Sequence, residues 1–173
     1  MGWDVAGGDV SSPLARLLNA PMRPGVAVWI GLRPARRQTL LAVLHADLDP
    51  VEGLIGDHYQ GRTNSARQVT LIQAEHIAAI AACLGVGQID PARLRRNVVV
   101  SGINLRALKG RRFSLGSALL EATGECHPCS RMEEVLGVGG YNAVRGHGGV
   151  TARIVRAGSV ALGDAMRRAD EAD

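Results

Sequence analysis

Aromatic residues, lysine and cysteine are all scarce in this 173-residue sequence. Aromatic side chains make up 3% of it, which argues against a stacking platform for nucleic-acid bases and predicts a core of Val, Leu, Ile and Ala. The single lysine, Lys109, argues against Schiff-base chemistry, and a chain this short with one lysine is not expected to be a pyridoxal phosphate domain. No apolar run approaches the roughly 18 residues that a membrane span requires, so we expect no membrane contact.

The length, charge and cysteine content together favour one cytoplasmic domain. A chain of 173 residues buries a substantial core without disulfide staples. Three cysteines leave one unpaired in any arrangement, and the first residues include Asp4 but neither a cationic leader nor an apolar stretch. The net charge of +4 comes from scattered arginines, which are typical of a solvated surface but also suit the recognition of anions.

The hydrophobic pattern predicts a mainly β fold with short helices, an α+β domain. We expect an N-terminal extension over residues 1–24, a domain over 25–165 and a polar tail over 166–173. Seven strands are expected, bounded by turn residues, over 26–34, 39–48, 67–73, 98–102, 111–116, 118–125 and 150–158. The long loop at 49–66 between them is typical of a functional segment. Many short strands with small helical insertions predict a β-barrel rather than repeated βαβ units.

Three short helices are expected between these strands. The spacing of Ile77, Ile80 and Leu84 predicts a helix that ends at Gly85, with Cys83 on its apolar side. Asp90 precedes a proline and is expected to cap a second helix. A third helix is expected over 131–136, ending at Gly137.

Cys126 and Cys129 form the one conspicuous motif, a C-x-x-C sequence that encloses His127 and Pro128. A structural zinc site needs about four ligands, and neither a second C-x-x-C nor an H-x-x-x-H sequence is present to complete it. A thioredoxin-like redox pair has the right local sequence, but it would lie unusually late in the chain and before a short helix. An inert buried cysteine is a further alternative.

The fourth interpretation concerns Cys129 alone. Ser130 and Glu133 have the spacing of a capping box, in which each side chain accepts a backbone N–H of the other residue. Cys129 would then precede the helix N-terminus, where free N–H groups, and Arg131 nearby, favour a thiolate. Such a thiolate could attack a substrate, carry sulfur or bind a soft metal.

Four stretches resemble the MOSC domain family, named after the C-terminal region of molybdenum cofactor sulfurase. They are "GLIGDHYQGR…RQVTLIQAEHI", "LRRNVVVSGINLRAL", "FSLGSALLEATGECHPCSRM" and "GGVTARIVRAGSVALGD". The resemblance covers about residues 25–165 and implies a cytoplasmic, MOSC-type β-barrel with a reactive cysteine that binds the molybdenum of a molybdopterin cofactor or carries sulfur. Some relatives reduce N-hydroxylated compounds.

The resemblance also indicates site residues. The family cysteine falls on Cys129, the metal ligand, with Cys126 beside it and His58 as a further catalytic candidate in the loop that begins Gly56-Asp57. Asp57 either orients His58 or, as the safer interpretation, caps the loop backbone. The cofactor, with its phosphate, is expected to contact residues in or beside the motifs: Arg62, Arg67, Gln68, Asn104, Arg131, Arg145 and His147. Ile103 stands where many relatives carry an acid.

Three functions follow as alternatives: a molybdenum oxidoreductase acting on a small molecule, a non-catalytic sulfur or cofactor carrier, and a thiol–disulfide oxidoreductase. Reduction would require a separate flavin or iron–sulfur partner, because three cysteines cannot hold a four-cysteine cluster. A carrier would instead need a sulfur-donor protein.

Overall fold

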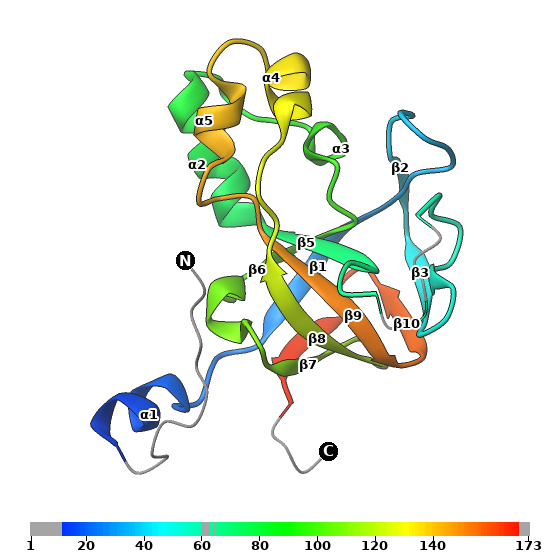
Figure 1. The fold of residues 1–173 in the computed structure, drawn as a ribbon, viewed down its shortest axis with the longest axis vertical. Helices are drawn as coiled ribbons and strands as arrows, with labels where there is room; N and C mark the ends of the chain where they lie inside the picture. Colours follow the sequence, from blue (N-terminus) through cyan, green and yellow to red (C-terminus); the bar gives the residue numbers. More distant parts are fainter. Residues whose placement is uncertain (1–11, 60–62, 64, 170–173) are drawn as a thin grey trace.

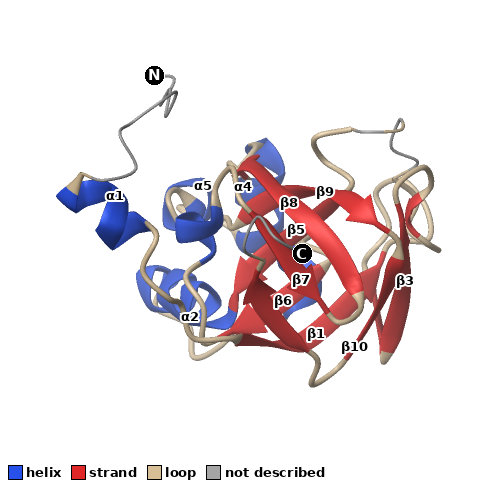
Figure 2. Ribbon diagram, turned by 90° about the horizontal axis from the view of Figure 1, so that it is seen from below, coloured by secondary structure: helices blue, strands red, loops and turns tan. Residues whose placement is uncertain are grey.

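A computed structural model describes residues 12–59, 63 and 65–169 of the chain. Its centre is a closed barrel of seven strands in the described residues, in the order β11-β7-β8-β9-β5-β6-β1, which β11 closes by pairing with β1. The barrel strands are β1 (Gly25–Leu32), β5 (Val69–Gln73), β6 (Val98–Ser101), β7 (Arg112–Leu115), β8 (Ala118–Glu125), β9 (Val150–Arg156) and β11 (Ala165–Arg168). Figure 2 shows these strands crossing around a common centre. The predicted mainly β, barrel-type fold is therefore confirmed.

The barrel is mixed because one strand pair is parallel. β5 and β6 run in the same direction, whereas the other barrel pairs are antiparallel. A parallel pair needs a long crossover, and here the chain between the two strands forms α2 (Ala74–Leu84) and α3 (Pro91–Leu94). Both helices were predicted, with Gly85 as the left-handed C-cap of α2 and Asp90 as the N-cap of α3.

The core consists of two apolar clusters that share β5 and β6. Inward-facing side chains such as Phe113, Leu120 and Ile154 fill the barrel. On the outer face, Ile72 and Val99 pack against α2, α4 (Ser130–Leu136) and α5 (Gly140–Val144). Every residue of β5 is buried because both of its faces are covered, including the polar residues Thr70 and Gln73. Figure 1 shows this helical layer at one end of the barrel.

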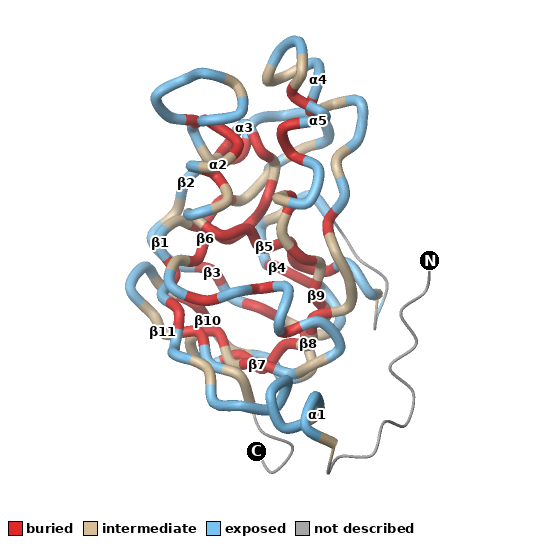
Figure 3. The backbone as a smooth tube through the Cα atoms, turned by 90° about the vertical axis from the view of Figure 1, so that its left-hand side faces the viewer, coloured by how far each residue is buried: buried red, intermediate tan, exposed pale blue. Residues whose placement is uncertain are grey.

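Smaller elements surround the barrel. A second sheet contains β3 (His45–Asp49), β4 (Gly53–Leu54) and β10 (Gly158–Ala161), while β2 (Leu41–Val43) pairs with β1 and the 3-10 helix η1 spans Leu105–Leu108. The helix α1 (Pro13–Leu18) has no buried residue, and Figure 3 shows it exposed beside the largely buried strands. None of the described helices is long and apolar enough to cross a membrane.

The structure differs from several local expectations. The single strand expected over 39–48 is divided into β2 and β3, and the helix α5 was not predicted. Cys83 is exposed rather than on the buried face of α2, because Ile77, Ile80 and Ala81 occupy that face.

Candidate functional site

The two cysteines of the C-x-x-C sequence lie in different environments between β8 and α4. Cys126 is 2% exposed, and its backbone N–H donates to the Gly149 carbonyl at 2.8 Å. Cys129 is exposed. Because the chain leaves the barrel at Cys126 and starts a surface helix after Cys129, only the second thiol is accessible to a ligand.

The predicted capping box is wrong. α4 begins at Ser130, so Cys129 itself is the N-cap, and no side chain caps the helix. Glu133 instead accepts backbone N–H bonds from Gly139 and Tyr141, both at 2.8 Å, and thereby caps the start of α5. These bonds, the one from Tyr141 first, lower the pKa of Glu133. The local sequence has the box pattern, but the packing of α5 against α4 provides a competing set of donors.

Two arginines contact Cys126. The Arg67 Nη2 atom donates to the Cys126 sulfur at 3.2 Å. Arg96 is 6% exposed and donates to the carbonyl oxygens of Gly148 at 2.7 Å, Leu94 at 2.8 Å and Cys126 at 3.3 Å. Burial is the largest influence on the pKa of Arg96 and lowers it, Arg67 lowers it further, and Cys126 acts in the opposite direction. Arg67 and Arg96 thus both contact Cys126, Arg67 through its sulfur and Arg96 through its carbonyl oxygen.

Arg95 interacts electrostatically with Cys129 and with three other arginines. Burial lowers the pKa of Arg95 most, and the nearby guanidinium groups of Arg33, Arg131 and Arg96 lower it further, whereas Cys129 raises it. Arg95 has a φ of 61°, a left-handed conformation that non-glycine residues rarely adopt. Within the described residues, Arg95 and Arg96 form no ion pair with a carboxylate. The exposed thiol therefore lies in a region of excess positive charge.

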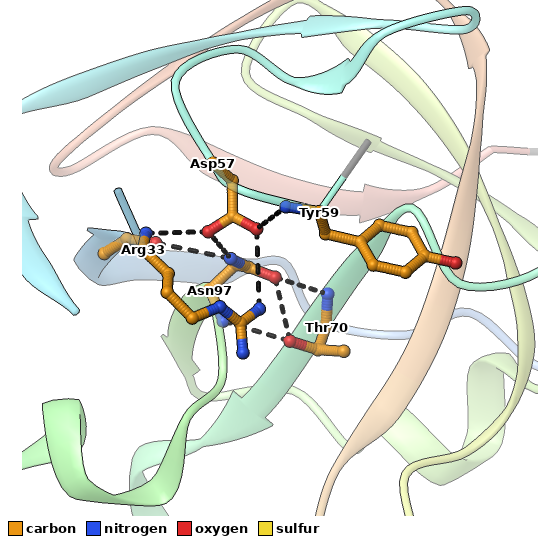
Figure 4. A network of polar contacts seen from close by, with 6 residues as sticks. Arg33, Asp57, Tyr59, Thr70 and Asn97 are labelled. Atoms are coloured by element: carbon orange, nitrogen blue, oxygen red, sulfur yellow. Dashed lines mark hydrogen bonds and ion pairs between the residues drawn. The ribbon is translucent and has the colours of Figure 1, made fainter. Parts of the chain in front are cut away.

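Asp57 holds Arg33 at the edge of this region (Figure 4). Its carboxylate accepts from the Arg33 backbone N–H at 2.7 Å and from the Arg33 guanidinium at 3.4 Å. The same carboxylate accepts from the Tyr59 backbone N–H at 3.1 Å and the Asn97 side chain at 3.2 Å, and Asn97 in turn bonds Thr70. The interpretation of Asp57 as a cap of the loop backbone is confirmed. His58 is exposed, and its backbone N–H donates to the Arg33 carbonyl.

The remaining predicted contacts are spread over the molecule. Gln68 is buried, and its side chain joins the Pro50 carbonyl to the Ile154 N–H, so both of its polar atoms serve the fold. Asn104 caps η1 through the Arg106 N–H. Exposed Arg145 lies beside Asn142, and Arg131 pairs with Glu134. Arg62 lies outside the described residues. Of the predicted residues, the structure thus groups Cys126, Cys129, Arg67 and Arg131.

His147 forms a pair with a residue that sequence analysis did not assign. The rings of His76 and His147 lie edge to face with centroids 5.0 Å apart, and the Nδ1 atom of each is buried without a hydrogen-bond partner. Burial, and then the charge of His147, lower the pKa of His76. A pocket beside His76 is also lined by Gln73, Arg106, Glu125, Cys126 and His127. In the part of the chain that the structure describes, no three His, Cys, Asp or Glu side chains form a metal-binding group.

Sequence analysis did not assign Arg33, Arg95 or Arg96 to the site. Arg33 is the last residue but one of the first predicted strand, and Arg95 and Arg96 follow the helix capped by Asp90. The one available signal was the sequence "LRRN", in which two arginines and an asparagine precede a buried strand. An arginine in that position must turn either toward solvent or under the neighbouring helix, and the sequence does not distinguish the two.

Comparisons with known proteins identify the class of domain to which the closed mixed barrel belongs. The sequence model of the MOSC domain family matches residues 38–167. The solved structure of the YuaD protein from Bacillus subtilis has a TM-score of 0.73 at 24% identity, over 83% of this chain and 94% of that one. YiiM from Geobacillus stearothermophilus has a TM-score of 0.65 at 14% identity, over 84% and 74%. YiiM from Escherichia coli has a TM-score of 0.64 at 16% identity, over 86% and 71%.

The protein belongs to the MOSC domain family, because the family match covers most of the chain. No curated protein matches it. At these identities the structural neighbours show the fold alone. MOSC domains are generally associated with the molybdenum cofactor.

Proposed function

We propose that this MOSC domain binds the molybdenum cofactor, with the Cys129 thiolate as the metal ligand. The observation that carries the proposal is an exposed thiol near four arginines, of which Arg95 and Arg96 form no ion pair with a carboxylate in the described residues. A thiolate is the soft ligand that suits such a metal centre, and guanidinium groups suit the phosphate of a pterin cofactor. The donor set of the site therefore fits the cofactor.

Each residue has a separate role in this proposal. Cys129 would hold the metal, and Arg95 and Arg131 would bind the anionic end of the cofactor. Asp57 keeps Arg33 in place through the two hydrogen bonds described above. The cofactor would supply a centre for two-electron chemistry, while the protein orients it and offsets its negative charge. α4 has seven residues and makes no side-chain cap, so we assign the positive potential at Cys129 to the arginines.

Reduction of an N-hydroxylated small molecule is the finer version of this proposal. It requires an electron donor, which a separate flavin or iron–sulfur protein would supply. We expect the protein to work in the cytoplasm, where thiols stay reduced. Purified protein loaded with cofactor should then reduce an N-hydroxylated base when such a donor is added, and the Cys129→Ser variant should not.

Elemental analysis by plasma mass spectrometry tests cofactor binding itself. Wild type, Cys129→Ser and Cys83→Ser are produced in a host that makes molybdopterin. Cys83 is exposed like Cys129 but lies on α2, away from the C-x-x-C sequence, so its variant is the matched control. We expect near-stoichiometric molybdenum in wild type and Cys83→Ser and its loss in Cys129→Ser. Equal molybdenum in all three would refute the assignment of Cys129, and zinc in its place would indicate a shared zinc site between subunits.

A sulfur carrier is the second candidate, favoured by the exposure of Cys129. Protein without molybdenum but with the added mass of one sulfur atom on the Cys129 peptide would support it over cofactor binding. A thiol–disulfide oxidoreductase predicts instead that Cys126→Ser and Cys129→Ser abolish activity equally.

A further inference from the structure

We propose that Cys126 is a positioning residue, whose buried sulfur fixes the guanidinium of Arg67 at the arginine site that also contains Arg96. The two cysteines of the C-x-x-C sequence would then have different roles: Cys126 holds an arginine in place, and Cys129 binds the ligand. The effect of Cys126 on cofactor binding rests on the proposed function, whereas the different roles of the two cysteines can be tested without any cofactor.

The first observation is the burial of the thiol. Cys126 is 2% exposed, while Cys129, three residues later, is exposed. A reagent or ligand that enters from solvent therefore reaches Cys129 and not Cys126. The chain around Cys126 is also fixed, since its N–H donates to the Gly149 carbonyl and its carbonyl accepts from Arg96.

The second observation is that two arginines contact Cys126 at different atoms. Its sulfur accepts a hydrogen bond from Arg67 at 3.2 Å, and its carbonyl oxygen accepts one from Arg96 at 3.3 Å. Arg96 is 6% exposed, and in the described residues its guanidinium donates to three carbonyl oxygens and to no carboxylate. A buried charge without an ionic partner is costly unless polar groups surround it. The Cys126 carbonyl provides one of these polar contacts.

The third observation is that Arg67 is an exposed residue whose guanidinium donates to the buried Cys126 sulfur. Long arginine side chains sample many rotamers in solvent, so an anchored tip reduces the entropy lost when a ligand binds. Without an acceptor at residue 126, Arg67 would move freely toward solvent. Alanine removes the acceptor, whereas serine retains one.

The experiment combines thiol mapping with the binding of an anion. Folded protein is treated with iodoacetamide, and each cysteine-containing peptide is quantified by mass spectrometry. We expect Cys83 and Cys129 to be alkylated at least tenfold faster than Cys126. Inorganic pyrophosphate, which mimics a phosphate-bearing ligand, is then titrated at fixed salt by calorimetry. We expect Cys126→Ala to bind it at least tenfold more weakly and Cys126→Ser within threefold of wild type.

A double-mutant cycle distinguishes the loss of the contact between Cys126 and Arg67 from a general loss of folded structure. Arg67→Met removes the guanidinium from the other end of the same contact without altering the buried position. If Cys126 acts by holding Arg67, the double variant Cys126→Ala/Arg67→Met loses little more affinity than either single variant. Additive losses, unchanged binding in Cys126→Ala, absence of pyrophosphate binding in wild type, or rapid alkylation of Cys126 would each overturn the proposal.

The outcomes also separate this inference from the proposed function. If wild type contains no molybdenum but the cycle is non-additive, Cys126 positions the arginines of a site that binds another anion. If wild type contains molybdenum and Cys126→Ala keeps both the metal and pyrophosphate affinity, the cofactor proposal stands and the positioning role is refuted.

Discussion

The side chain of Asn97 donates to the Asp57 carboxylate at 3.2 Å, which joins the loop after β4 to the residue before β6. The same carboxylate accepts two hydrogen bonds from Arg33 at the end of β1. Its side chain is 2% exposed. Asp57 therefore connects three segments that are distant in the sequence, and Arg96 directly precedes one of them. This connection predicts that the site and the stability of the barrel are coupled through Asp57.

Replacement of Asp57 by alanine should lower the free energy of unfolding by about 3 kcal/mol, because several buried donors lose their acceptor. Asp57→Asn should lie between wild type and Asp57→Ala, since the amide keeps one oxygen but not the charge. Urea unfolding followed by circular dichroism measures both changes. Asp47, an exposed residue of β3, gives the control variant Asp47→Ala, which should stay within about 0.5 kcal/mol of wild type. Equal urea midpoints for Asp57→Ala and Asp47→Ala would show that the hydrogen bonds of Asp57 do not stabilise the barrel.

Local structure was largely predictable because its causes lie within a few residues. Gly85 ends α2 in the left-handed conformation and Asp90 caps α3, as their positions in the pattern indicated. The resemblance of four stretches to MOSC domains was likewise confirmed by the family match. Glu133 shows the limit of this reasoning. Its spacing from Ser130 fits a capping box, but the N–H groups of α5 lie within its reach in the folded chain.

The arginine site was less predictable because its members come together only in the closed barrel. Arg67 and Cys126 are 59 residues apart in sequence and meet through their hydrogen bond. The parallel pairing of β5 with β6 brings the segment containing Arg96 beside the one containing Arg67, and no local pattern encodes that pairing. Arginines are also ambiguous in sequence, since solvated and buried ones occur in similar surroundings. Arg95 shares its local sequence with buried Arg96 and is itself only partly buried.

Arg95 should show opposite effects on stability and on binding. Its φ of 61° is strained for a side chain with a Cβ atom but not for glycine. Arg95→Gly should therefore be as stable as wild type or more stable by up to about 1 kcal/mol. The same variant should lose molybdenum content and pyrophosphate affinity, because it removes a guanidinium near Cys129.

Thermal unfolding and the two binding measurements on one preparation separate these effects. Arg37 is the other described non-glycine residue with a positive φ, at 67°, so Arg37→Gly serves as the matched control. It should gain stability without loss of binding. A marked loss of stability in Arg95→Gly would mean that packing of the side chain outweighs the backbone strain.

Gly148 should not tolerate a side chain. A Cβ atom there would overlap the Cys126 carbonyl and press on the Arg96 guanidinium. Gly148→Ala should therefore lower the free energy of unfolding by about 1–3 kcal/mol, the usual range for overpacking, and weaken pyrophosphate binding. Gly87 has open space around it and no positive φ, so Gly87→Ala should leave both properties unchanged. Chemical unfolding and calorimetry on the two variants test this, and similar results for both would refute the close contact of residues 126 and 148.

The pair of His76 and His147 should make stability fall in mild acid. Burial first, and then the charge of His147, lower the pKa of His76 below its usual 6.5. The folded state therefore binds this proton more weakly than the unfolded state does. Stability from this group is complete above about pH 6.5 and is lost as the pH falls toward the folded pKa. Glu75 opposes the shift and Arg106 adds to it, so the net direction remains destabilising on acidification.

His76→Gln should remove this part of the pH dependence, because glutamine does not gain a charge. Urea midpoints at pH 7.5 and 5.5 should fall less for His76→Gln than for wild type. His45 is exposed on β3 and far from this pair in sequence, so His45→Gln should fall as much as wild type. Carboxylates such as Glu133, whose pKa is lowered from 4.5, lose their contribution only at more acidic pH and leave this window unaffected. If His76→Gln and wild type lose stability equally between these two pH values, the histidine contact is not the source of acid sensitivity in the fold.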